Sequence, residues 1–163
     1  MAILVRRPRR KITYSSYAGE TTAAPPNLVK RNFHADKPST LWLTDITEFV
    51  ASNGKVYLSA TVDCFDGKIV GWTTGRHPTT DMAEQSLNEA IASHPPDDKS
   101  PLVLHSDRGT HYRANSWITI ARNTGIIRSI SKKGLLTRQF CVRGILRQNE
   151  KRNVLLQNLA RCR

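Results

Sequence analysis

The chain has 163 residues and a formal net charge of +12 at pH 7. This length suits one domain with a buried core and is short for two ordinary domains. No apolar run approaches the length of a membrane span, and the start MAILVRRPRRK lacks the apolar stretch of a signal peptide. The cysteines Cys64, Cys141 and Cys162 show no metal-type spacing, so we expect a reducing, cytoplasmic location.

The positive charge is concentrated at the two ends of the chain. Residues 1–40 contain eight Lys and Arg against two acidic residues, and residues 135–163 contain seven against one. Residues 41–134 contain ten of each kind. Basic arms of this kind are an electrostatic footprint for nucleic acid, although charge alone fits solvated tails equally well.

The first part of the chain predicts an arm followed by three strands. Residues 1–40 mix basic residues with Ser, Thr and Pro25-Pro26, which is typical of an arm or linker. The strand-like segments LWLTDITEFV, KVYLSATVDCF and KIVGWTT are then separated by Asn53-Gly54 and Asp66-Gly67. Both dipeptides tolerate positive φ and favour hairpin turns, so we expect three antiparallel strands in a meander.

The next segments predict two helices and two further strands. TTDMAEQSLNEAIASHPP indicates a helix capped by Thr80 or Asp81 and stopped by Pro95-Pro96. Its apolar stripe is formed by Ala83, Leu87, Ala90, Ile91 and His94. PLVLHSD predicts a buried strand, RANSWITIARNTG a short amphipathic helix ended by Gly125, and IIRSIS a fifth strand. The order β-β-β-α-β-α-β predicts an α/β fold with a mixed sheet and flanking helices.

Two aspartates lie in or next to these strands. Asp45 stands inside LWLTDITEF although Asp is disfavoured in strands, and Asp107 ends the strand PLVLHSD. By alternation Asp45 shares a sheet face with Leu41, Leu43 and Phe49. Two carboxylates at the ends of adjacent strands could bind Mg²⁺ for phosphoryl transfer. Spacing alone favours the plainer alternative, in which Asp45 pairs with a basic side chain and Asp107 caps a turn.

A family resemblance favours the metal site. LWLTDITEF, GKVYLSATVDCFDGKIVGW and VLHSDRGTHYRANSW resemble, in this order, the catalytic core of bacterial insertion-sequence transposases in the retroviral-integrase superfamily. The match is to the insertion-sequence-three type, second reading frame, and YSSYAGE and PPNLVKRNFHAD are similar to that family's lead-in. The resemblance implies an RNase-H-like fold and the DDE mechanism. In that mechanism three acidic residues bind two Mg²⁺ or Mn²⁺ ions, which activate a water or 3′-hydroxyl and stabilise the leaving oxygen.

The resemblance also assigns roles to individual residues. Asp45 is expected to be the first acid and Asp107 the second, each as a metal ligand and catalytic residue. The loop around the second acid is expected to be shaped by His105, Ser106, Arg108, Gly109 and Tyr112. Apart from this site, the core is expected to contain Trp42, Trp72 and Trp117. Surface or structural positions are expected for His77, His94 and His111, because they form no ligand constellation.

The third acid of the family is missing from its expected place. The resemblance puts a glutamate on a helix at position 143, where this sequence has Arg143. The only acidic residue after Gly134 is Glu150, seven residues late and surrounded by basic residues. A displacement of the third acid by seven residues is hard to reconcile with a metal site whose ligands need sub-ångström placement.

A shift of reading frame accounts for residues 135–163. Codons allowed for the segment from Gly134 can be read one base along as CSPDNSACEGFFGRMKNETF, which carries the family's D-N and E-x-F-F pattern. Its glutamate falls at position 143, and although the wobble bases are a free choice, about twenty consecutive positions agree. We therefore interpret residues 1–40 as a basic arm or linker and 41–134 as a truncated integrase-like core without its C-terminal helices. Residues 135–163 are then an out-of-frame basic tail, expected to be poorly ordered.

Three functions are compatible with this sequence. The first is a transposase fragment for Mg²⁺-dependent strand cleavage and strand transfer in DNA transposition, inactive as translated because its metal site is incomplete. Its expected partners are DNA, as transposon ends and target, and intact transposase protomers, with no membrane. The second is a non-catalytic remnant that binds DNA or the intact transposase. The third is an RNase-H-like host nuclease, against which the lead-in and HSDRGTHY argue.

Overall fold

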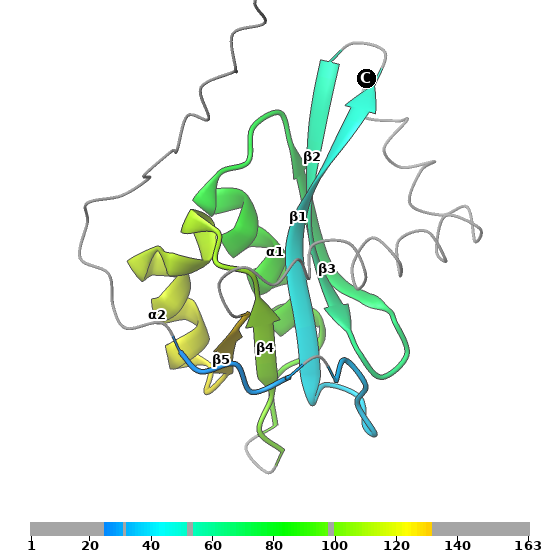
Figure 1. Ribbon diagram of the computed structural model, residues 1–163, viewed down its shortest axis with the longest axis vertical. Helices are drawn as coiled ribbons and strands as arrows, with labels where there is room; N and C mark the ends of the chain where they lie inside the picture. The colour runs from blue at the N-terminus through cyan, green and yellow to red at the C-terminus, as the bar shows by residue number, and fades with distance from the viewer. Residues whose placement is uncertain (1–24, 31, 52–53, 98–99, 132–163) are drawn as a thin grey trace, which may run out of the picture.

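A single mixed sheet of five strands, in the order β3-β2-β1-β4-β5, organises the described part of the chain (Figure 1). The computed structural model describes residues 25–30, 32–51, 54–97 and 100–131. The strands are β1 (Leu41–Ala51), β2 (Gly54–Asp63), β3 (Ile69–Gly75), β4 (Val103–Ser106) and β5 (Ile127–Ile130). The first three pair antiparallel, and β4 and β5 are added parallel to β1 and to each other. The predicted order of elements and the α/β fold class are confirmed.

Glycine at the two hairpin turns explains the antiparallel meander. Gly54 has a φ of 128° and Gly67 a φ of 71°, a region of backbone conformation that other L-residues rarely adopt. The second turn is closed by two backbone hydrogen bonds, from the Asp63 N–H to the Lys68 carbonyl at 2.8 Å and from the Gly67 N–H to the Asp63 carbonyl at 2.9 Å. The turn dipeptides therefore fix the register of β1, β2 and β3 locally.

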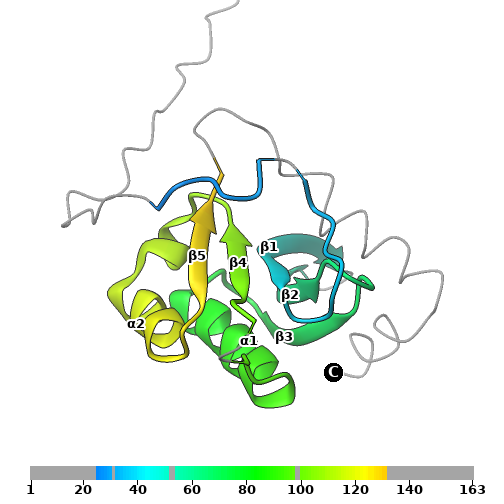
Figure 2. The same ribbon diagram turned by 90° about the horizontal axis from the view of Figure 1, so that it is seen from below.

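Both helices lie on the same side of the sheet (Figure 2). Helix α1 spans Thr80–Ser93 and α2 spans Asn115–Asn123, with a short 3-10 helix, η1 (Thr110–Arg113), before α2. As predicted, Gly125 follows the end of α2, with a φ of 70°. The predicted N-cap of α1 is wrong by one residue. Thr79 caps the helix, because its Oγ1 accepts the Met82 N–H at 3.3 Å.

The buried face of α1 also differs from the predicted apolar stripe. Ala83, Leu87 and Ala90 are buried as predicted, but Met82 and Ser86 are buried as well, Ile91 is half-buried and His94 is exposed. Ser86 is tolerated in the interior because its Oγ lies 2.8 Å from the Ser59 Oγ and donates to the Ala83 carbonyl at 3.0 Å. The helix approaches the sheet most closely at Gly71, and this contact turns Ser86 and Ala90 inward.

The sheet has an apolar cluster on each face. The helix side is filled by Trp42, Val70, Ala83, Leu87, Ala90, Leu102, Leu104, Tyr112, Trp117, Ala121 and Ile126. The opposite side is filled by Val29, Ala35, Leu41, Leu43, Leu58, Ala60, Val62 and Cys64. The prediction that the tryptophans belong to the core is confirmed for Trp42 and Trp117, and the half-buried Trp72 packs against the second cluster.

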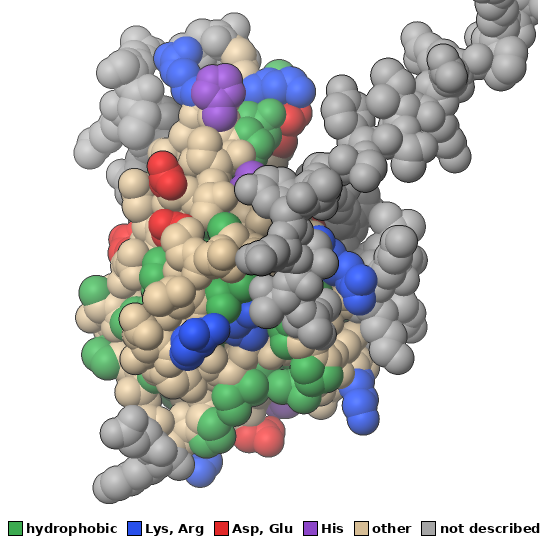
Figure 3. All heavy atoms as spheres, turned by 90° about the vertical axis from the view of Figure 1, so that its left-hand side faces the viewer, with side chains coloured by type: hydrophobic (Ala, Val, Ile, Leu, Met, Phe, Trp, Pro, Cys, Tyr) green, Lys and Arg blue, Asp and Glu red, His purple; other side chains and the backbone are tan. Residues whose placement is uncertain are grey.

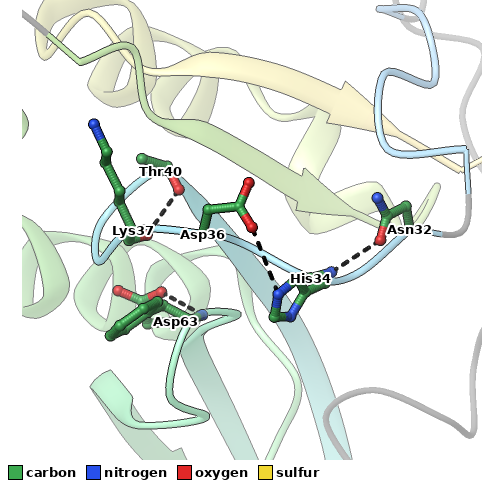
Figure 4. A network of polar contacts seen from close by, with 7 residues as sticks. Asn32, His34, Asp36, Lys37, Thr40 and Asp63 are labelled. Atoms are coloured by element: carbon green, nitrogen blue, oxygen red, sulfur yellow. Dashed lines mark hydrogen bonds and ion pairs between the residues drawn. The ribbon is translucent and has the colours of Figure 1, made fainter.

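The segment 25–40 crosses the face of the sheet opposite the helices (Figure 2, blue). Val29 and Ala35 are buried there, the Ser39 N–H donates to Asp63 Oδ2 at 2.7 Å, and the Val103 N–H donates to the Thr40 carbonyl at 2.9 Å. Local hydrogen bonds of Asn32, His34, Lys37 and Thr40 shape its turns (Figure 4). Sequence analysis assigned this segment to the arm. The domain boundaries stay a prediction, but residues 25–40 lie on the sheet.

Several expectations fall outside the described residues. Residues 1–24 of the basic arm and residues 132–163, with Arg143 and Glu150, are among them. The predicted poor order of the tail and the absence of its helices therefore stay predictions. In the ranges that are described, no helix is long and apolar enough to cross a membrane.

Candidate active site

The parallel pairing of β1 with β4 brings the two singled-out aspartates to the same edge of the sheet. Leu41, Trp42 and Leu43 pair with Val103, Leu104 and His105. Asp45 and Asp107 each follow two residues after the last of these pairs, on neighbouring parallel strands. Paired positions of parallel strands point to the same face, so continuing this register places both carboxylates on one face. Both residues are half-buried.

Asp107 begins a tight turn whose backbone binds its carboxylate. The Gly109 N–H donates to Asp107 Oδ1 at 2.7 Å, and the Tyr112 N–H donates to the Gly109 carbonyl at 3.2 Å. The Arg108 Nε donates to the Ser131 carbonyl at 2.9 Å, and the Ser131 N–H donates to the Ser106 carbonyl at 3.2 Å. We call residues 107–112 the second-acid turn. Its N-terminal end is held next to Ser131, the residue that follows β5.

Tyr112 is a buried tyrosine whose pKa is affected by Asp45 and Asp107. Its side chain is buried, and its ring meets the Trp117 ring edge-on with centroids 5.3 Å apart. Burial raises the pKa of the Tyr112 hydroxyl well above its ordinary value, and the negative charges of Asp45 and Asp107 raise that pKa further. The raised pKa of Tyr112 is thus due first to burial and second to the two carboxylate charges.

His105 is a buried structural residue beside the second acid. Its Nδ1 lies 2.9 Å from the Ser129 Oγ, which also accepts the Leu28 N–H at 3.0 Å. The Phe33 ring packs edge-on against the His105 ring at 5.8 Å. Burial lowers the pKa of His105 against the opposing effect of Asp107, so this imidazole is neutral at physiological pH.

Arg128 supports the second-acid turn but was not singled out from the sequence. Its Nη2 donates to the Tyr112 carbonyl at 3.1 Å, and its guanidinium lies 5.5 Å from the centre of the Trp117 ring. Burial lowers the pKa of Arg128, and neighbouring Arg122 lowers it further. No sequence signal could have identified this contact, because Arg128 and Tyr112 belong to different elements and meet only through the β4–β5 pairing.

Other candidate ligands do not gather into a metal centre. Across the described ranges, no three His, Cys, Asp or Glu side chains form a group that could hold a metal ion. His77 and His94 are exposed and His111 is half-buried. On the side of the molecule seen in Figure 3, Lys and Arg side chains occupy separate places over the described surface. Arg108, on the second-acid turn, and Arg113, directly after it, are both exposed.

The family model described as "Integrase core domain" matches residues 35–135. The chain belongs to the integrase core domain family. The matched region contains all five strands, both helices and both aspartates of the candidate site. The resemblance to insertion-sequence transposases is confirmed at the level of the integrase core.

Similar proteins are insertion-sequence transposases and retroviral integrases. The chain is 47% identical over 132 residues to a probable transposase for insertion sequence element IS1353 of Shigella flexneri, covering 81% of this chain and 25% of that protein. It is 36% identical over 121 residues to the putative transposase InsK for IS150 of Escherichia coli K12, covering 74% of this chain and 42% of that protein.

The solved integrase structures show the fold. The catalytic core domain of HTLV-2 integrase in complex with magnesium has a TM-score of 0.56 and 18% identity, covering 79% of this chain and 77% of that one. The RNase-H-like, integrase-core fold class is thereby confirmed. The present chain covers only 25% of the IS1353 transposase and 42% of the IS150 transposase.

Proposed function

We propose that this chain is the catalytic-core part of an insertion-sequence transposase, with Asp45 and Asp107 as two of its three metal ligands. The observation that carries the proposal is the parallel register of β1 and β4, which brings these carboxylates to one edge and one face. The names of the curated relatives, which are insertion-sequence transposases, support DNA transposition as the reaction. The proposed location is the cytoplasm, where DNA and Mg²⁺ are both available.

The donor set suits a hard divalent cation. Carboxylate oxygens are the ligands that Mg²⁺ and Mn²⁺ prefer, and two such groups on adjacent strands match a site in which substrate phosphate oxygens complete the coordination. When bound, the metal supplies activation of the attacking oxygen and stabilisation of the leaving oxygen. A relative of the same fold, the HTLV-2 integrase core, is described in complex with magnesium. Asp45 and Asp107 would hold the ion here.

The chain itself would supply the remaining contacts to DNA. Exposed Arg108 and Arg113 lie on or next to the second-acid turn, where a phosphate of the bound strand would have to pass. Guanidinium groups bind phosphate oxygens in bidentate geometry and orient the strand without reading its sequence. The net charge of +12 adds a long-range attraction for DNA.

We also propose that the chain is inactive as translated. Arg143 stands where the family glutamate is expected, so a carboxylate ligand is replaced by a cation. Removing one ligand from a carboxylate cluster weakens metal binding, and a positive charge in its place opposes it further. The first test is to read the coding DNA across codons 130–163 in all three frames. An unbroken D-N…E-x-F-F segment in the neighbouring frame supports the shift, whereas stop codons and unrelated residues would exclude it.

The catalytic assignment is tested by restoring that frame. We expect the restored chain to nick duplex DNA in the presence of Mg²⁺ or Mn²⁺, and the present chain to show no metal-dependent nicking. Asp45→Asn and Asp107→Asn should each lower the restored activity by at least about a hundredfold, because each removes a metal ligand. The matched control is Asp66→Asn, an exposed aspartate in the β2–β3 turn. Full activity in either site variant would refute the metal-site assignment.

A second candidate function is a non-catalytic remnant that binds DNA. Its supporting observation is the concentration of positive charge in residues 1–40 and 135–163, which does not depend on an intact metal site. Such a remnant would inhibit an intact transposase by occupying transposon ends. Co-expression should then reduce transposition frequency. An unchanged frequency would remove this candidate.

A further inference from the structure

Gly109 is a glycine for a reason that backbone conformation does not explain. Its φ of −54° and ψ of 146° are accessible to any L-residue. A Cβ built at this position would lie 2.8 Å from Asp107 Oδ1, closer than real Cβ atoms approach other heavy atoms. The same oxygen accepts the Gly109 N–H at 2.7 Å. The missing side chain therefore leaves room for one carboxylate oxygen.

The surroundings of Gly109 limit how the clash could be relieved. The same Cβ would lie 3.5 Å from Tyr112 Cδ2, and the Tyr112 ring is buried against Trp117. Arg128 holds the Tyr112 carbonyl and Arg108 holds the Ser131 carbonyl, so the turn is fixed on both sides. The group that can move most easily is the Asp107 carboxylate. It would rotate away from the Gly109 N–H.

We propose that Gly109 is a positioning residue for the reaction, acting through Asp107. Its N–H donates to Oδ1, which would fix the carboxylate rotamer in which Asp107 would hold the metal ion. This inference rests on the proposed function, because it requires Asp107 to be a metal ligand. Outer hydrogen bonds of this kind orient metal ligands, and their loss typically costs about 10- to 100-fold in metal affinity.

The test is Mn²⁺ titration of the full chain into the millimolar range, followed by paramagnetic broadening of amide resonances in nuclear magnetic resonance spectra. In the wild-type chain we expect broadening centred on residues 45 and 107–109. Gly109→Ala should lower the apparent Mn²⁺ affinity by roughly 10- to 100-fold, and Asp107→Asn should abolish site-specific broadening. The matched control is Gly75→Ala, whose Cβ would lie 3.1 Å from the flexible Met82 Sδ and would contact no residue of the turn.

Each outcome decides between the two proposals. If wild type and Gly109→Ala bind Mn²⁺ equally while Asp107→Asn does not, the positioning role is refuted and the metal site stands. If neither the wild-type chain nor the frame-restored chain, in which the third acid is present, shows broadening at these residues, the metal site fails, and the role of Gly109 fails with it. If Gly109→Ala loses the dispersed spectrum of a folded chain, the glycine serves the fold instead, which overturns the proposal. The Gly109 amide shift in the metal-free Asp107→Asn chain checks the turn separately, because an asparagine Oδ1 can keep accepting that N–H.

Discussion

Two aspartates at the ends of strands, Asp63 and Asp107, differ in how many of their carboxylate oxygens accept backbone N–H groups. Asp63 is buried, and both of its oxygens accept backbone N–H groups, Oδ1 from Phe65 at 2.9 Å and Oδ2 from Ser39 at 2.7 Å. Asp107 is half-buried and accepts the Gly109 N–H through Oδ1. Because both Asp63 oxygens accept backbone N–H groups, this carboxylate links the segment 25–40 to the β2–β3 turn. We call this link the Asp63 clamp.

Removing the Asp63 clamp should destabilise the whole fold. Asp63→Ala leaves two backbone N–H groups of this partly buried region without their acceptor, at a cost of roughly 2–4 kcal/mol in the free energy of unfolding. Urea unfolding followed by tryptophan fluorescence measures the loss. The control is Asp66→Ala, which removes an exposed ion pair with Lys68 and should cost less than about 1 kcal/mol. Equal losses in both variants would show that Asp63 does not clamp the segment.

The buried Tyr112 hydroxyl should make the protein sensitive to alkali. Its folded-state pKa is raised above the ordinary value of 10.0, so the folded chain keeps this proton after the unfolded chain has lost it. The contribution of the protonated Tyr112 hydroxyl to the free energy of unfolding is therefore full below about pH 10 and is lost as pH rises above that value. The difference in unfolding free energy between wild type and Tyr112→Phe should be constant at lower pH and should move in favour of Tyr112→Phe above pH 10. A difference independent of pH would contradict the burial of this hydroxyl beside two carboxylates.

At the scale of elements, β3 and α1 pack closely against each other at Gly71. A Cβ at Gly71 would lie 2.2 Å from the Ser86 carbonyl oxygen and 2.5 Å from the Ala90 backbone nitrogen. Both atoms belong to helix backbone, which cannot move aside as a flexible side chain can. The absence of a side chain at Gly71 therefore allows α1 to lie this close to the sheet.

Gly71→Ala should be among the most destabilising single substitutions in the described part of the chain. Overpacking in a core typically costs about 1–3 kcal/mol and occasionally more, and here the clash is with backbone. Thermal unfolding by circular dichroism measures the effect, with Gly75→Ala on the same strand as the control because its neighbour is a flexible methionine. A Gly71→Ala protein as stable as the control would show that α1 can shift outward without cost.

The elements that sequence predicted well are those with local signals. Asn53-Gly54 and Asp66-Gly67 specify their turns through residues adjacent in the chain, and the meander followed. The cap of α1 was missed because Thr79, Thr80 and Asp81 can all cap a helix, and only the position of the helix on the sheet selects Thr79. The burial of residues 25–40 was missed because Val29 and Ala35 are isolated apolar residues with no period.

The candidate site depends even more strongly on contacts between residues distant in sequence, which local patterns do not predict. Asp45 could be recognised as unusual because it interrupts an apolar strand. Its position relative to Asp107 depends on the parallel register of β1 and β4, which are separated in sequence by β2, β3 and α1. Spacing in the sequence alone favoured the alternative in which Asp45 pairs with a basic side chain and Asp107 caps a turn. Only the family resemblance predicted that the two carboxylates form one metal site. Arg128 and Ser129, which support the second-acid turn and His105, gave no sequence signal.

At the scale of the whole molecule, the described residues form an integrase core with helices on one face of the sheet and the segment 25–40 on the other. Both candidate ligands lie within the region matched by the family model, and the expected position of the third acid, 143, lies beyond that region and beyond the described residues. Asp45 and Asp107 thus both lie within the integrase core, and their role as metal ligands stays a proposal. The identity of the third ligand depends on residues outside the described part of the chain.

The measurement that tests this account most directly is anomalous diffraction from Mn²⁺-soaked crystals of the frame-restored chain, in which the third acid is present. Our account predicts an anomalous difference peak in contact with the carboxylates of both Asp45 and Asp107, which disappears in Asp107→Asn crystals. A peak elsewhere, or a structure in which Asp45 and Asp107 point away from each other with no Mn²⁺ bound between them, would contradict the metal site and the function proposed from it.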